Sequence, residues 1–114
     1  MEWTPLVDVA QLDAIDQLSK NHPVLIFKHS TRCAISKAAL NRLEREWGAA
    51  DDAAHAAYFL DLLAHRDISD AVAARYGIRH ESPQVLVIRS RQCSYTATHT
   101  GIGYKDTMQA LAAH

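Results

Sequence analysis

Two short runs of apolar residues constrain the fold of this chain more than any other feature. Residues 24–27 (Val-Leu-Ile-Phe) and residues 85–88 (Val-Leu-Val-Ile) contain only apolar side chains, and polar residues or proline flank them. Both runs are much shorter than the ~18 apolar residues that a membrane-spanning helix needs. Their length and their β-branched residues are typical of fully buried strands, which helices cover on both faces. The two runs therefore predict the central strands of an α/β fold.

Helical patterns alternate with strand patterns along the chain. Apolar residues at helical spacing predict helices at residues 8–19, 33–47, 67–76 and 105–113. Asp8 is the expected N-cap of the first helix, whose buried face would carry Leu12, Ile15 and Leu18. Gly48 and Gly77 are the expected C-caps of the second and third helices.

The remaining segments complete the predicted order. Strands are expected at residues 24–28, 57–62, 85–89 and 93–99, with a marginal first strand around residues 3–7. Residues 49–56 are predicted to be a loop or a frayed helix end. A right-handed β-α-β unit followed by an antiparallel hairpin would produce a mixed sheet. We therefore expect one α/β domain over residues 1–114, a thioredoxin-like three-layer sandwich with a central mixed sheet.

Charge and cysteine content narrow the class of function. The 12 basic and 13 acidic residues give a net charge of −1, so we expect no nucleic-acid partner and no membrane partner. The first twenty residues lack the basic start and apolar core of a signal peptide. Two cysteines are too few for a secreted disulfide framework. We expect a cytoplasmic protein that is a monomer rather than an oligomer.

Cys33 carries the clearest chemical signal. It follows a predicted strand and begins a predicted helix, where free backbone N–H groups and the helix dipole favour a thiolate. Arg32 and Lys37 add positive charge on either side. A buried structural cysteine is the alternative, because free cysteines are among the most buried residues. The position and its cationic flank favour a reactive thiol, with Arg32 and Ser36 supporting the thiolate.

Ser36 completes a Cys-x-x-Ser pattern. A dithiol redox pair would have a second cysteine at this position. A serine hydroxyl can donate a hydrogen bond to a thiolate, but it cannot resolve a mixed disulfide, so the pattern predicts monothiol exchange at Cys33. Cys93 is not expected to resolve it either, because the intervening strand carries the chain about 16 Å away. A disulfide needs Cα atoms about 4.4–6.8 Å apart.

Five further positions border the predicted site. Ser82 and Pro83 precede a strand, where a thioredoxin-like fold places a cis proline facing the cysteine; an ordinary trans proline that opens a strand is the alternative. Together with Thr31 they are expected to position a substrate. His29 and His80 flank the site and are candidates for tuning Cys33 or contacting substrate. The histidine spacing matches no metal motif, so we expect no metal.

Three segments resemble a known family. Residues 27–36 resemble the Lys-His-Ser-x-x-Cys-Pro-Ile-Ser segment of the YtxJ-type monothiol bacilliredoxins, residues 76–84 resemble that family's Tyr-Gly-Val-x-His-Glu-Ser-Pro-Gln segment, and residues 98–100 resemble its Ser-His-Ser stretch. The resemblance implies a thioredoxin-like fold, Cys33 as the active cysteine, Pro83 as the cis proline, and a cytosolic role with bacillithiol, a small thiol that replaces glutathione in some bacteria. Ala34 departs from the usual proline, which should loosen the first helical turn.

Three functions are compatible with these observations. The first is a thiol-disulfide oxidoreductase that removes bacillithiol from bacillithiolated proteins through Cys33, with bacillithiol as co-substrate and no bound cofactor. Lys28, Arg32 and the helix N-terminus would attract the anionic malyl group of bacillithiol. The second is a module that binds an iron–sulfur cluster with the help of a bound thiol. The third is a redox-inert interaction domain, in which Cys33 would be unreactive.

Overall fold

The computed structural model describes residues 1–112 and contains one mixed sheet. Its five strands lie in the order β1-β3-β2-β4-β5 and comprise β1 (Trp3–Pro5), β2 (Val24–His29), β3 (Ala56–Asp61), β4 (Gln84–Arg89) and β5 (Gln92–Thr98). The first three strands are parallel to one another, whereas β4 is antiparallel to β2 and β5 is antiparallel to β4. The mixed sheet and the marginal first strand are both confirmed.

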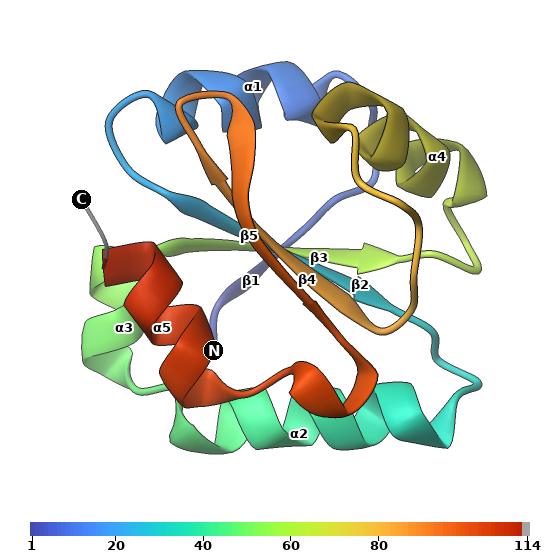
Figure 1. Ribbon diagram of the computed structural model, residues 1–114, viewed down its shortest axis with the longest axis vertical. Helices are drawn as coiled ribbons and strands as arrows, with labels where there is room; N and C mark the ends of the chain where they lie inside the picture. Colours follow the sequence, from blue (N-terminus) through green and yellow to red (C-terminus); the bar gives the residue numbers. More distant parts are fainter. Residues whose placement is uncertain (113–114) are drawn as a thin grey trace.

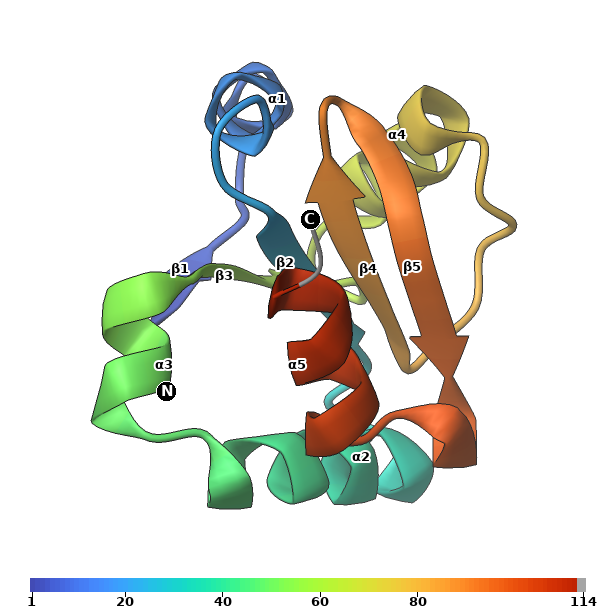
Figure 2. The same ribbon diagram turned by 60° about the vertical axis from the view of Figure 1, so that its left-hand side comes forward.

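Helices cover both faces of this sheet (Figures 1 and 2). One face carries α1 (Gln11–Ser19) and α4 (Arg66–Tyr76). The opposite face carries α2 (Ala34–Glu46), α3 (Ala49–Ala54) and α5 (Tyr104–Ala112), and a 3₁₀ turn, η1 (His99–Gly101), follows β5. The predicted three-layer α/β sandwich is therefore confirmed. Over residues 1–112, no helix is both long enough and apolar enough to cross a membrane.

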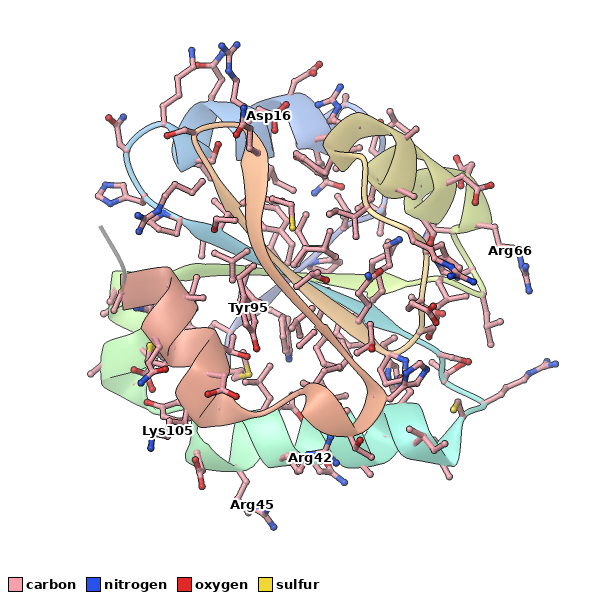
Figure 3. The ribbon with its side chains drawn as sticks, viewed as in Figure 1. Asp16, Arg42, Arg45, Arg66, Tyr95 and Lys105 are labelled. Carbon is pink, nitrogen blue, oxygen red and sulfur yellow. The ribbon has the colours of Figure 1, made fainter. Side chains whose placement is uncertain are left out.

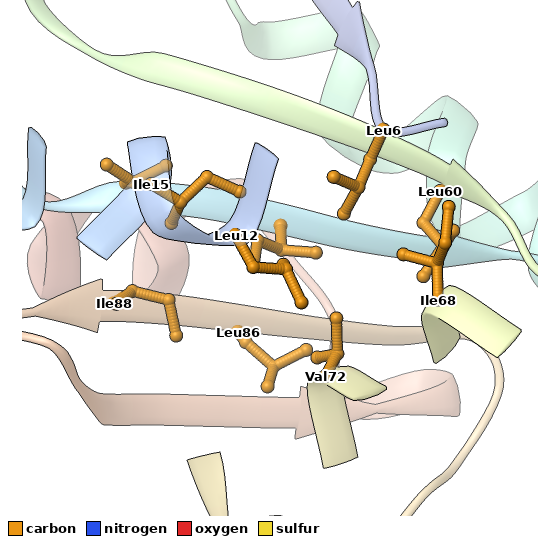
Figure 4. Packing of buried hydrophobic residues seen from close by; sticks show 10 residues of the cluster. Leu6, Leu12, Ile15, Leu60, Ile68, Val72, Leu86 and Ile88 are labelled. Carbon is orange, nitrogen blue, oxygen red and sulfur yellow. The ribbon is translucent and has the colours of Figure 1, made fainter. Parts of the chain in front are cut away.

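Polar contacts join the two helices of the first face. Asp16 of α1, labelled in Figure 3, accepts hydrogen bonds from the Tyr76 hydroxyl at 2.7 Å and from Arg75 at 3.2 Å. Both donors lie at the end of α4. Beneath them, Leu12 and Ile15 of α1 pack with residues of α4 and of the sheet (Figure 4). This face therefore has an apolar core, and hydrogen bonds between α1 and the end of α4 hold the two helices together above it.

Strand β2 lies in the middle of the molecule and supplies both cores. Val24 and Ile26 pack toward α1 and α4, whereas Leu25 and Phe27 pack toward α2 and α5. Successive side chains of a strand point to opposite faces, so a strand covered on both sides reads as a continuous apolar run. The alternation continues to the end of β2, where the polar residues Lys28 and His29 are also buried.

The first helix ends at Ser19 as predicted, but it differs from its prediction in its start and in its buried face. It begins at Gln11, because residues 8–10 form a turn in which Asp8 Oδ1 accepts the Ala10 N–H at 2.9 Å. Leu18, expected on the buried face, is 42% exposed. Ser19 takes the buried place instead, and its hydroxyl donates to the Asp16 carbonyl at 2.7 Å. A hydrophobic side chain alone therefore does not decide which face of a short helix is buried.

The two glycine predictions have different outcomes. Gly77 has φ 63° and ends α4 in the left-handed region, as expected of a C-cap. Gly48 has φ −105° and instead begins α3, where Asp51 Oδ2 accepts its N–H at 2.9 Å. The segment predicted as a loop or frayed end is thus a short helix of its own. The last predicted helical position, residue 113, lies outside the described residues.

Candidate active site

Cys33 occupies the predicted place between a central strand and a helix. The loop of residues 30–33 joins β2 to α2, and Cys33 is the N-cap of α2 with φ −108° and ψ 120°. Its N–H donates to the Ser30 carbonyl at 3.2 Å, and its carbonyl accepts the Lys37 N–H at 3.0 Å. The residue is only partly buried, so its thiol lies at the boundary between the core and solvent.

The surroundings of Cys33 are cationic and in part apolar. Thr31, Arg32 and Lys37 are exposed, and the first turn of α2 contains no acidic residue. The free N–H groups of this turn add the positive end of the helix dipole. Ile35 in the same turn is 54% exposed, an apolar contribution that the sequence analysis did not identify. The charged side chains that an anionic group meets on this segment are therefore all cationic.

Ser36 lies in this first turn but faces away from solvent. It is completely buried, its Oγ lies 2.6 Å from His29 Nδ1, and the Ser30 N–H donates to the same oxygen at 3.1 Å. Over residues 1–112 no hydrogen bond reaches the Cys33 sulfur from this hydroxyl. The expectation that Ser36 supports the thiolate directly is therefore not met, because the side chain turns toward the sheet and bonds to His29 and to the loop.

His29 is buried rather than exposed beside the site. Only 4% of it is accessible, and its ring lies 5.4 Å from that of Phe59 on β3. Burial lowers the pKa of His29 below its ordinary value, and the nearby Lys37 acts in the same direction, whereas Asp61 and Glu44 oppose the shift. The ring is therefore neutral near pH 7, and the free nitrogen of a neutral imidazole can accept a hydrogen bond from a serine hydroxyl.

The second loop of the site precedes β4. The Ser82–Pro83 peptide bond is cis, as the sequence predicts, and Pro83 is buried. The Ser82 hydroxyl is also buried, and within residues 1–112 it has no hydrogen-bond partner. Gln84 holds the preceding backbone, because its side-chain oxygen accepts the Glu81 N–H at 3.3 Å and its amide donates to the Arg79 carbonyl at 3.2 Å.

Lys28 and His80 lie on the opposite face from His29. The Lys28 ammonium is fully buried, donates to the Ser69 carbonyl at 3.3 Å and lies 3.3 Å from His80 Nδ1. That imidazole nitrogen is also 3.2 Å from the Ser69 hydroxyl. The expectation that Lys28 attracts an anionic ligand is therefore wrong. His80 is turned toward Lys28, so the structure gives it no contact with Cys33.

The ionisation of this second polar group follows from its burial. Burial lowers the pKa of Lys28 to about 8, and the negative charge of Asp70 limits the shift. Burial also lowers the pKa of His80, with the positive charge of Lys28 as the next cause. When His80 is neutral, its Nδ1 can accept a hydrogen bond from the charged Lys28 ammonium. The two residues therefore act as one unit that fixes the loop before Pro83 to β2 and α4.

A third loop beside Pro83 was not found by sequence reasoning. The His99 N–H donates to the Pro83 carbonyl at 3.2 Å, and His99 has φ 52°, in the left-handed region. Arg42 of α2 donates to the carbonyls of His99 and Ile102, each at 3.0 Å, and fastens η1 to the helix (Figure 3). The only sequence signal was the short stretch at residues 98–100, which gave no reason to place His99 next to Pro83.

Cys93 lies at the other end of the sheet. It pairs with Ile88 of β4, which in turn pairs with Val24 at the start of β2, whereas Cys33 follows the end of β2. The length of β2 separates the two thiols by about 16 Å, which excludes a disulfide between them. Burial raises the pKa of Cys93, and its sulfur donates to the Tyr95 carbonyl at 3.2 Å. Over residues 1–112, no three His, Cys, Asp or Glu side chains gather in a way that could hold a metal.

The fold and the position of Cys33 together define a thioredoxin-like protein of the thiol-disulfide oxidoreductase class. The family model of the monothiol bacilliredoxin BrxC matches residues 4–107, and the chain belongs to this family. It is similar to a solved structure described as having a thioredoxin fold, at 25% identity, a TM-score of 0.78, and coverage of 93% of this chain and 90% of the other.

Two thioredoxins share the fold at lower identity. Thioredoxin of Malassezia sympodialis matches at 18% identity with a TM-score of 0.73, over 99% of this chain and 90% of that one. Thioredoxin f of spinach chloroplast matches at 18% identity with a TM-score of 0.69, over 98% of this chain and 92% of that one. These likenesses establish the arrangement of strands and helices around Cys33.

Proposed function

We propose that this protein removes bacillithiol from protein mixed disulfides by monothiol exchange at Cys33. The observation that carries the proposal is the setting of the two thiols. Cys33 is partly accessible at a helix N-terminus, a serine occupies the position of a resolving cysteine, and Cys93 lies at the far end of the sheet. One thiol alone can accept an adduct, but it needs an external thiol to release it.

The proposed reaction has two exchange steps. The Cys33 thiolate attacks the bacillithiol sulfur of the mixed disulfide, the S–S bond breaks, and the client protein leaves as a thiolate. Cys33 is then disulfide-bonded to bacillithiol. The thiolate of a second bacillithiol molecule attacks the bacillithiol sulfur on Cys33, which releases the Cys33 thiolate and bacillithiol disulfide. Each step breaks one S–S bond and forms another, so one free bacillithiol thiol is consumed, one client thiol is released, and no external oxidant or reductant is needed.

The residues around Cys33 have distinct proposed roles. Arg32 and the N-terminal turn of α2 attract the anionic malyl group, since Lys28 is buried elsewhere. Thr31, Ser82 and Pro83 would position the substrate beside the thiol. The Ser82 hydroxyl, which has no hydrogen-bond partner within residues 1–112, is the group of this set that is left to bond a substrate.

Whole-protein mass spectrometry tests this function. The protein is incubated with bacillithiol disulfide, with the Cys93→Ser variant as the matched control that retains Cys33. We expect both to gain the mass of one bacillithiol at Cys33 and to lose it when free bacillithiol is added. Release of bacillithiol from a modified client protein should depend on Cys33 alone. Absence of an adduct at Cys33 would contradict the proposal, and visible absorbance of an anaerobically purified protein would favour the cluster-binding alternative.

A further inference from the structure

The hydrogen bond between Ser36 and His29 is the shortest contact between two side chains near Cys33. Its 2.6 Å separation joins a residue that is completely buried to one that is 4% exposed. Neither atom can reach solvent, so each must be satisfied inside the protein. Exchange at Cys33 as proposed does not use either group, and the bond therefore needs its own explanation.

The proton positions follow from the partners of the Ser36 oxygen. The Ser30 N–H donates to this oxygen at 3.1 Å. Within residues 1–112, His29 Nδ1 is the only acceptor within reach of the hydroxyl proton of Ser36. The hydroxyl therefore donates to Nδ1, and the imidazole carries its proton on Nε2. A protonated His29 would carry a proton on both nitrogens and could not accept this bond.

This pair closes the loop that carries Cys33. Ser30 is the first residue after β2, and its N–H is bonded to Ser36, three positions inside the helix from Cys33. The carbonyl of Ser30 in turn accepts the Cys33 N–H at 3.2 Å. His29 fixes the Ser36 hydroxyl, the hydroxyl fixes Ser30, and Ser30 fixes Cys33. We propose that His29 is a positioning residue for Cys33 that acts through Ser36, an inference that rests on the proposed exchange at Cys33.

Burial keeps His29 in the accepting state near neutral pH, although charged groups of both signs lie around it. Asp61 faces it from β3, and Lys37 and Glu44 face it from α2. The two carboxylates favour the charged ring, but burial and the positive charge of Lys37 outweigh them. Acidification must therefore pass below the ordinary titration range of histidine, near pH 6.5, before His29 loses its role as acceptor.

Three substitutions separate positioning from structural support. His29→Asn places an amide oxygen where Nδ1 lies and keeps an acceptor that does not titrate. His29→Leu and Ser36→Ala each remove one partner. His55→Leu is the matched control, because His55 is a partly buried histidine whose pKa is also lowered by burial, but it lies at the end of α3. Thermal unfolding of every variant identifies those that fold.

The measured quantity is the rate of Cys33 alkylation by iodoacetamide as a function of pH. We expect His29→Leu and Ser36→Ala to lower the rate about tenfold each, as loss of a buried hydrogen bond predicts. The double variant should lose no more than either single one, because both remove the same bond. His29→Asn should restore the rate to within about threefold of wild type, and His55→Leu should not change it.

The pH profile distinguishes positioning from a general effect on folding. The ratio of the wild-type rate to the His29→Asn rate cancels the titration of Cys33 itself. We expect this ratio to be constant above pH 7 and to fall on acidification, since only wild type loses its acceptor. In parallel, the ¹⁵N shift of His29 Nδ1 should change in Ser36→Ala. A ratio that is independent of pH, or an alkylation rate of folded His29→Leu equal to wild type, would overturn the proposal.

Alkylation also separates this inference from the proposed function. Iodoacetamide measures the reactivity of the Cys33 thiol in the absence of bacillithiol. The positioning role of His29 is therefore tested independently of the proposed function. If the variants behave as expected but no bacillithiol adduct forms on Cys33, the proposed function is wrong and the positioning of the thiol by His29 is right. If the adduct forms and the variants alkylate like wild type, the opposite holds.

Discussion

Lys28 and His29 are consecutive residues at the end of β2, yet they organise two different regions. His29 points toward α2 and holds the Cys33 loop through Ser36. Lys28 points toward α4 and holds the loop before Pro83 through His80. The alternation of one strand thus delivers a buried polar side chain to each of two loops at this end of the sheet, the loop that carries Cys33 and the loop before Pro83.

The two regions differ in how their polar groups are satisfied. The pair of His29 and Ser36 is neutral and compact. Lys28 is charged, yet among residues 1–112 no carboxylate lies within ion-pair distance of its ammonium group. Its hydrogen bonds go only to the Ser69 carbonyl and the His80 imidazole. Burying a charged group with neutral partners costs more free energy than burying a neutral pair. We therefore expect the Cys33 side to control reactivity and the Lys28 side to control the pH dependence of stability.

The largest effect is expected from removal of the thiol between these two regions. Cys33→Ser should lower bacillithiol release from a client protein by more than about a hundredfold, because no other described thiol lies near the site. Cys93→Ser should retain at least about half of the activity, since Cys93 lies beyond disulfide reach. The measurement is the release of bacillithiol by mass spectrometry. A stable adduct that accumulates on Cys33 only in Cys93→Ser would show that Cys93 takes part.

A cysteine introduced on either side of the sheet sharpens the comparison. Ser36→Cys should form a disulfide with Cys33 on oxidation, because it creates the Cys-x-x-Cys spacing of a dithiol redox pair across the first turn of α2. The neutral His29 ring would accept a hydrogen bond from the new thiol. Ser69→Cys, in the Lys28 region, is the matched control and should form none. The protein mass should fall by two hydrogen atoms in Ser36→Cys alone; a disulfide in Ser69→Cys would contradict the separation of the two regions.

The strands and the start of α2 were predictable because their signals are local. The apolar run at residues 24–27 identifies a strand covered on both faces, and the polar residues that follow it mark the turn to Cys33. Gly77 ends a helix through its own backbone freedom. In each case the deciding residues are neighbours in the chain, so the pattern alone determines the outcome.

The buried polar pairs were not predictable because their partners are distant in sequence or depend on helix rotation. Lys28 bonds to Ser69, 41 positions away, and a lysine at the end of a strand usually reads as exposed. Whether the Ser36 hydroxyl faces Cys33 or His29 depends on the rotation of α2 against the sheet. His99 reaches Pro83 only because the β4–β5 hairpin returns to the same edge. These facts follow from packing rather than from any motif.

A third effect concerns the way in which Lys28 makes the stability of the protein depend on pH. The unfolded chain keeps this lysine protonated up to about pH 10.5, whereas the folded chain releases the proton near pH 8. The unfolded state therefore binds more protons between these values, and the free energy of unfolding rises with pH by up to about 3 kcal/mol from this residue. Lys28→Met should abolish this rise.

Denaturant unfolding of wild type and Lys28→Met between pH 7 and pH 10.5 measures the difference. Ionisation of Tyr76, whose pKa is raised by burial, affects both proteins equally and cancels in the subtraction. Lys20→Met is the matched control, because Lys20 is exposed at the end of α1. If the difference in the free energy of unfolding between wild type and Lys28→Met stays constant across this pH range, the buried ammonium is not destabilised in the folded protein.

The smallest effect is expected from the exposed charge beside Cys33. Arg32 is exposed, so its attraction for an anionic disulfide is screened by water and salt. Reversal of this charge in Arg32→Glu should slow the reaction with bacillithiol disulfide about fivefold at low salt. The reaction with uncharged iodoacetamide should change less, because no anion is attracted. Stopped-flow measurements of both rates at two salt concentrations separate attraction of the substrate from a change in the reactivity of the thiol itself.

Arg45→Glu provides the matched control for this charge reversal. Arg45 is exposed in the last turn of the same helix (Figure 3), and the rise of an α-helix places it ~18 Å from the first turn. This distance exceeds the Debye length of about 10 Å at 0.1 M salt, so Arg45→Glu should leave the rate unchanged. The slowing in Arg32→Glu should shrink as salt rises. An equal slowing in both variants would assign the effect to net charge, and a slowing that is independent of salt would assign it to the geometry of the Cys33 loop.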